Sequence, residues 1–150
     1  MSEVTDVNET HPLTVVVDAS VWVSRLVPQD VHHEASRRWF ESFSADGGRL
    51  VAPVLLLPEI AGAISRRTGV PDLARKAVQQ LQRMRTLRLV ALDRRLGQAA
   101  SQLAADLGLR GADATYVAIA DQLKIPLVTW DNEHVEKAGK RITVRMPDQS

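Results

Sequence analysis

Short apolar runs alternate along this chain with longer segments in which apolar residues recur every three or four positions. The runs have the length and β-branched character of buried strands and cover residues 13–17, 49–52, 87–92, 126–130 and 141–145. Helical spacing fills the intervals, with helices expected at about 20–26, 30–43, 58–68, 71–84, 94–107, 112–124 and 132–138. Strands that alternate with helices predict an α/β fold, a three-layer α/β/α sandwich with a central parallel sheet of about five strands.

The segments between these elements indicate a single domain. Gly69 and Gly108 stand where helices would end, and Asp93 stands where one would begin. Residues 1–12 are polar and are expected to form a flexible tail, while residues 13–146 form the domain. The helix expected at 30–43 carries Val31, Ala35, Trp39 and Phe43 on one stripe, which is a candidate interface for a partner.

Composition limits the class of protein. The chain has 150 residues, of which 45% are hydrophobic and 25% charged, as in an ordinary soluble domain. It has no cysteine, which excludes disulfides and thiolate metal sites. The N-terminus does not resemble a signal peptide, and no apolar run approaches the roughly 20 residues of a membrane span. A cytoplasmic location without membrane contact is therefore expected.

Four acidic residues lie where the predicted fold would bring them together. Asp18 and Asp131 directly follow the first and fourth strands, and Glu59 and Asp113 lie in the first turns of helices. Each alone is explained as a helix cap or first-turn acid. Glu59 is harder to explain, because its neighbours are apolar and no lysine or arginine lies within six residues. Together these acids predict a divalent-cation site at the carboxyl edge of the sheet.

The sequence also resembles a known family. The segments VVVDASVWV, PEIAGAI, GADATYVAIA and LVTWD, in this order, look like the PIN domain, and most like the VapC-type toxins of toxin–antitoxin pairs. The resemblance covers nearly all of residues 13–145 and implies a parallel sheet with helices on both faces. It implies that the catalytic and metal site consists of four acids, Asp18, Glu59, Asp113 and Asp131. It also implies two auxiliary hydroxyl residues, Ser20 and Thr129.

One position departs from the family pattern. The family often has an asparagine three residues after the glutamate, and here that position is Gly62. Gly62 supplies no side-chain hydrogen bond, so the support of Glu59 is expected to differ, although no acid is missing.

The resemblance implies a Mg²⁺-dependent endoribonuclease that hydrolyses RNA phosphodiester bonds. Oxygen ligands favour Mg²⁺, with Mn²⁺ as the alternative. Asp18 and Asp131 are the expected direct ligands, followed by Asp113, with Glu59 acting through water or as a general base. Glu133 and His134 follow Asp131 closely enough to reach the pocket, Glu133 as an auxiliary acid, although a solvated helix start also explains both.

The expected partners follow from charge and from the resemblance. Residues 66–95 contain nine basic and two acidic residues, a net charge of +7 in a chain whose total is +1. This region is the candidate RNA-binding surface, led by Arg66, Arg67, Arg83 and Arg85, although a solvated helix face is an equal alternative. VapC-like proteins are also typically neutralised by a small antitoxin and often form homodimers.

Two other classes compete with this interpretation. An inactive PIN-like module would bind RNA or protein without cleavage, although the presence of all four acids argues against it. A receiver-like signalling domain would also place acids at strand ends, with Asp93 as the phosphate acceptor, but it needs an acidic pair after the first strand and a lysine after the fifth, and neither is present.

Overall fold

Five parallel strands form the centre of the protein in a computed structural model that describes residues 13–149. They are β1 (Thr14–Val17), β2 (Arg49–Pro53), β3 (Leu87–Val90), β4 (Leu127–Val128) and β5 (Val144–Arg145). Their order in the sheet is β3-β2-β1-β4-β5, and every neighbouring pair is parallel. The predicted α/β fold with a parallel five-stranded sheet is confirmed.

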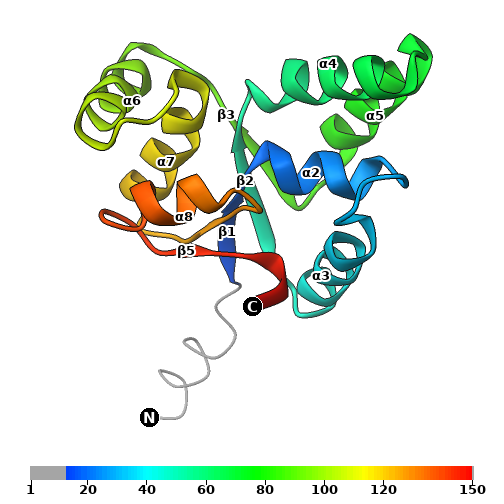
Figure 1. The fold of residues 1–150 in the computed structure, drawn as a ribbon, viewed down its shortest axis with the longest axis horizontal. Coiled ribbons are helices and arrows are strands. Elements are labelled where there is room, and N and C mark those ends of the chain that lie inside the picture. The colour runs from blue at the N-terminus through cyan, green and yellow to red at the C-terminus, as the bar shows by residue number, and fades with distance from the viewer. Residues whose placement is uncertain (1–12, 150) are drawn as a thin grey trace.

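Helices cover both faces of this sheet (Figure 1). One face carries α2 (Ala19–Leu26), α3 (His33–Ala45), α4 (Leu56–Thr68) and α5 (Pro71–Arg83), and the other carries α6 (Arg94–Leu107), α7 (Gly111–Leu123) and α8 (Asn132–Ala138). A 3₁₀ turn, η1 (Pro147–Gln149), packs against α3. None of the described helices is long and apolar enough to cross a membrane.

Local sequence signals explain several helix boundaries. The carboxylate of Asp93 accepts a hydrogen bond from Leu96 N (2.9 Å) and caps α6. Gly69 and Gly108 end α4 and α6 with φ values of 71° and 69°, a conformation that glycine adopts without steric cost. The expected caps therefore form.

Helix α7 is the most deeply buried helix of the described part of the chain. Every residue from Ala114 to Ala120 is buried, because α7 packs between the central strands and α6. Its small residues allow close packing against the sheet, and the same packing fixes Asp113 at the carboxyl edge.

The prediction of a helix at 30–43 is wrong at its first residues. Asp30 Oδ1 accepts a hydrogen bond from His32 N (2.8 Å) in a turn, and the helix begins only at His33. Val31 therefore lies outside the predicted stripe and is 90% exposed, whereas Trp39 is buried and stacks on Phe43. Asp30 explains the later start of the helix, because its side chain stabilises a turn more readily than a helix interior.

The two strands on one side of β1 are shorter than expected. β4 and β5 have two residues each, although the contact continues where Thr129 N donates to Arg145 O (3.0 Å). The tail expected at residues 1–12 lies outside the described residues.

Candidate metal centre

Four helix starts meet at the carboxyl edge of the sheet. β1 and β4 are neighbours, so Asp18 after β1 and Asp131 after β4 are brought to the same edge. Both are also helix caps, with Ser20 N donating to Asp18 (3.4 Å) and Glu133 N donating to Asp131 (2.8 Å). The positive ends of the helix dipoles favour acids here, so the capping and site interpretations are compatible.

Asp18 is the most buried of the four acids. Its exposed fraction is 4%, and its Oδ2 accepts hydrogen bonds from Ser20 Oγ (2.7 Å) and Thr129 Oγ1 (2.9 Å). Burial raises the pKa of Asp18, and these hydroxyls together with His134 oppose that effect.

The same two hydroxyls join the ends of β1 and β4. Ser20 Oγ accepts from Trp130 N (3.2 Å), and Thr129 Oγ1 accepts from Asp131 N (3.0 Å). Each hydroxyl thus donates to Asp18 and accepts from the loop that leads to α8. Ser20 and Thr129 therefore fix Asp18 relative to Asp131, and their auxiliary role in a cation site stays a prediction.

His134 lies among the acids. It is 3% exposed, and its Nε2 lies 2.9 Å from Asp113 Oδ2 and 3.9 Å from Asp131 Oδ2, while its Nδ1 lies 3.8 Å from Asp18 Oδ2. Neither ring nitrogen makes a hydrogen bond within the described structure, although Nε2 is close enough to Asp113 Oδ2 to form an ion pair when the ring is protonated. Burial lowers the pKa of His134, but Asp113 and the other acids outweigh burial and raise it.

Glu59 lies beside this group and is bound by a residue that sequence reasoning missed. Tyr116 is fully buried, and its hydroxyl donates to Glu59 Oε1 at 2.5 Å. Burial raises the pKa of Glu59, Tyr116 opposes the rise, and the charges of Asp18 and Asp113 add to it. The spacing offered a signal, since Tyr116 follows Asp113 by three residues and so shares a face of α7.

The donor set fits a divalent cation. Asp18, Asp113 and His134 each offer a ligand atom, and these atoms lie within 4.8 Å of one another. Carboxylates in this arrangement repel one another unless a cation is bound, and the orphaned nitrogens of His134 are free to be ligands. Asp131 lies near this three-residue group, and Glu59 accepts its hydrogen bond from Tyr116 beside it.

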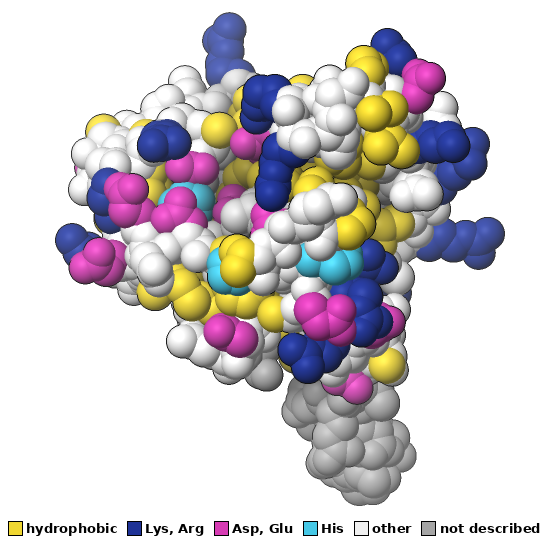
Figure 2. Space-filling view, turned by 45° about the vertical axis from the view of Figure 1, so that its right-hand side comes forward, with side chains coloured by type: hydrophobic (Ala, Val, Ile, Leu, Met, Phe, Trp, Pro, Cys, Tyr) yellow, Lys and Arg dark blue, Asp and Glu magenta, His cyan; other side chains and the backbone are white. Residues whose placement is uncertain are grey.

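Cavities open on two sides of the acids. One of about 240 Å³ is lined by residues that include Arg110, Asp113, Asp131, Glu133, His134 and Lys137. The other, of about 540 Å³, is lined by residues that include Ser20, His32, Glu59, Arg66, Arg67 and Trp130. Figure 2 shows acidic and basic side chains close together around the hollow near the centre of this face. Glu133 also lines the smaller cavity, where its exposed carboxylate pairs with Lys137 Nζ (2.7 Å).

The predicted basic surface divides into two parts. Arg66 and Arg67 line the larger cavity beside Glu59. Arg83 and Arg85 lie before β3, at the amino end of the sheet, and therefore away from the acids. Arg67 Nη1 donates to Asp30 Oδ2 (2.7 Å), and Arg66 Nη1 lies 3.0 Å from the point where a Cβ of Gly62 would stand.

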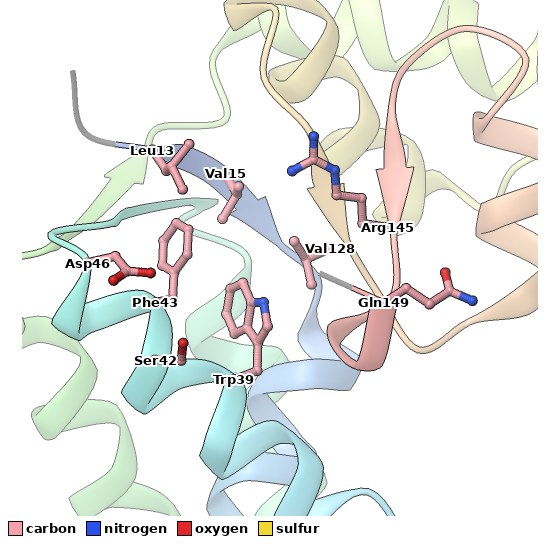
Figure 3. Close-up of a pocket in the computed structure, with 9 residues that line it drawn as sticks. All are labelled: Leu13, Val15, Trp39, Ser42, Phe43, Asp46, Val128, Arg145 and Gln149. Carbon is pink, nitrogen blue, oxygen red and sulfur yellow. The ribbon is translucent and has the colours of Figure 1, made fainter. Parts of the chain in front are cut away.

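A further cavity, of about 290 Å³, lies away from the acids. Its wall includes Val15, Trp39, Phe43 and Val128, with Asp46 as its one acidic residue (Figure 3). It contains none of the candidate site residues.

The fold and site define a class, an α/β protein with a cluster of carboxylates and a histidine at the carboxyl edge of a parallel sheet. The sequence matches the PIN domain family over residues 15–140. The chain belongs to the PIN domain family.

Solved structures share the fold at low sequence identity. VapC20 from Mycobacterium tuberculosis, described as a sarcin–ricin loop cleaving toxin, is 19% identical with a TM-score of 0.68 and covers 79% of this chain and 90% of its own. VapBC2 from Rickettsia felis, bound to a promoter DNA fragment, is 10% identical with a TM-score of 0.69 and covers 89% of this chain and 98% of its own. A FitAcB structure from Neisseria gonorrhoeae is 18% identical with a TM-score of 0.65 and covers 89% and 97% respectively. No curated protein matches the sequence.

The receiver-like alternative is wrong. The strand order β3-β2-β1-β4-β5 differs from the 2-1-3-4-5 order of receiver domains. Asp93, the residue that would accept phosphate there, caps α6 instead.

Proposed function

We propose that this protein is a divalent-cation-dependent endoribonuclease and the toxin of a type II toxin–antitoxin pair. The observation that carries the proposal is the buried Asp18, fixed by two hydroxyls and grouped with Asp113 and His134 within 4.8 Å. Burial opposes the charge of Asp18 despite these hydroxyl donors, so such a group is more stable when a cation is bound.

Each acid then has a distinct task. Asp18 and Asp113 hold the cation, Mg²⁺ or Mn²⁺, and Asp131 completes the set from the exposed side. A cation there offsets charge on the scissile phosphate and increases the acidity of water. Glu59, with its raised pKa and its Tyr116 partner, holds or accepts a proton at the edge of the group.

RNA binding is assigned to the larger cavity. Arg66 lines this cavity beside Glu59 and forms no ion pair within the described residues, whereas Arg67 is already paired with Asp30. A guanidinium beside the carboxylates offsets the repulsion between them and the phosphates. Arg83 and Arg85, at the other end of the sheet, would contact RNA only distant from the scissile bond.

The assembly proposed for the protein follows its structural neighbours. They include VapBC and FitAB complexes, some of them bound to DNA. We therefore include a small antitoxin as the cognate partner, a homodimeric state and action in the cytoplasm.

The test is cleavage of total cellular RNA by the purified protein. Wild type is expected to cleave with Mg²⁺ or Mn²⁺ and to lose activity with a chelator. Asp18→Asn and Asp113→Asn are expected to reduce the rate by about 100-fold or more, because each removes a charged ligand.

The matched control is Asp106→Asn, the same substitution at an exposed acid on α6. It should cleave like wild type. Equal cleavage by Asp18→Asn and wild type would contradict the proposal, as would chelator-resistant cleavage.

A further inference from the structure

A histidine lies among the acids of the candidate cation site. His134 side-chain atoms are 4% exposed, and both ring nitrogens are buried without a hydrogen bond in the described structure. A buried polar group with no partner is costly and requires an explanation. The four acids expected at this site all offer oxygen only, so His134 changes its ligand chemistry.

The position of the ring suits ligation. Nε2 lies 2.9 Å from Asp113 Oδ2 and 3.9 Å from Asp131 Oδ2. Two ligands bound to one ion at about 2.1 Å each are separated by at most about 4 Å, so these separations suit shared ligation. One ligand atom each from His134, Asp113 and Asp18 also lie within 4.8 Å of one another. An imidazolium paired with Asp113 is the rival role, and it differs from ligation in what removal of the ring does to cation binding.

We infer that His134 is a nitrogen ligand of the bound cation, together with Asp18 and Asp113, and that it makes the site prefer Mn²⁺ and later transition-metal ions to Mg²⁺. The inference builds on the proposed cation-dependent function and specifies the ion. Mg²⁺ is a hard ion that binds oxygen almost exclusively, whereas imidazole favours first-row transition metals. With one nitrogen and two carboxylates, the affinity should increase from Mg²⁺ to Mn²⁺ to Ni²⁺.

The first experiment measures ion selectivity without RNA. Dissociation constants for Mg²⁺, Mn²⁺ and Ni²⁺ are determined by calorimetry for wild type, His134→Phe and the matched control His32→Phe. His32 is stacked on Trp130 in the neighbouring cavity and outside the acid group. In His134→Phe the preference for Mn²⁺ and Ni²⁺ over Mg²⁺ should fall at least about tenfold, and in His32→Phe it should not change.

If His134 is instead a positively charged counter-ion of the acids, this experiment gives a different result. A fixed positive charge repels every divalent ion, so its removal would strengthen Mg²⁺ and Mn²⁺ binding alike and leave their ratio unchanged. An unchanged ratio would overturn the inference.

The second experiment needs no variant. Wild type is labelled with ¹⁵N-histidine, loaded with Mn²⁺ and examined by pulsed electron paramagnetic resonance. A nitrogen coupling of directly bound imidazole supports the inference, and its absence overturns it. Both readouts are independent of nuclease activity, so loss of the proposed RNA cleavage alone would leave the His134 assignment standing.

Discussion

At the scale of a single residue, the burial of Asp18 opposes the negative charge of its carboxylate. Its carboxylate is 4% exposed, and burial raises its pKa despite two hydroxyl donors. For an acid whose pKa is raised by folding, the charged form destabilises the folded state at neutral pH. Asp18 caps α2, but its buried charge therefore decreases the stability of the folded state unless a cation is present.

The variant Asp18→Asn is therefore expected to melt at a higher temperature than wild type when cations are removed, by a few degrees. The amide keeps an acceptor for Ser20 and Thr129 and also caps α2. The variant should lose the increase in Tm that Mg²⁺ or Mn²⁺ gives wild type. Differential scanning fluorimetry with and without cation measures both. A full cation-induced shift in the variant would exclude Asp18 as a ligand.

At the scale of an element, α4 combines an acid at one end with two arginines at the other. Gly62, where the family often has asparagine, lies between them and leaves space for Arg66 to fold back along the helix. The departure at Gly62 thus has a structural counterpart that the sequence did not show, because the path of an arginine side chain depends on its neighbours in three dimensions.

Substitution of Gly62 by asparagine tests this relation. A Cβ there would stand 3.0 Å from Arg66 Nη1, so the guanidinium must shift by a few tenths of an ångström. KM for RNA should rise with little change in kcat, since a phosphate contact is weakened and the acids are intact. Steady-state kinetics measure this, with Gly97→Asn on α6, where a Cβ has no neighbour within 4 Å, as the control. An unchanged KM would remove Arg66 from the RNA-binding surface.

An ion pair between Arg67 and Asp30 joins α4 to the turn before α3. Burial raises the pKa of Asp30, but the hydrogen bonds from Arg67 and His32 N outweigh burial and lower it below 3.8. An acid with a lowered pKa stabilises the fold above the unfolded value, and the contribution is lost as pH falls through the folded value. Arg67 is 41% exposed, so the pair contributes at most about 1 kcal/mol.

At pH 7, Arg67→Gln should accordingly lower the free energy of unfolding by at most about 1 kcal/mol. At a pH below the lowered pKa of Asp30, the substitution should leave the free energy of unfolding unchanged. Urea unfolding across this range measures the change, with Arg66→Gln as the neighbouring control without an ion pair in the described chain. A loss that is the same at both pH values would mean that Arg67 acts through packing rather than charge.

At the scale of the whole molecule, strand order determines where the chemistry lies. β1 occupies the centre of the sheet with β2 and β4 on either side, so acids separated by more than a hundred residues meet at one edge. The same order separates the basic region, with Arg66 beside the acids and Arg83 at the opposite end. Net charge along the sequence could not make that distinction, because it contains no information on which end of a strand a residue occupies.

The sequence by itself determined the strand and helix pattern, the parallel sheet and the four acids, because these depend on local periodicity, capping and residue chemistry. It could not determine the partners of those acids. Tyr116 reaches Glu59 across two helices, and His134 lies between Asp113 and Asp18, contacts that depend on how α4, α7 and α8 pack. Tertiary structure therefore decided that a histidine lies among the acids, since only packing fixes which buried polar atoms remain without a hydrogen bond.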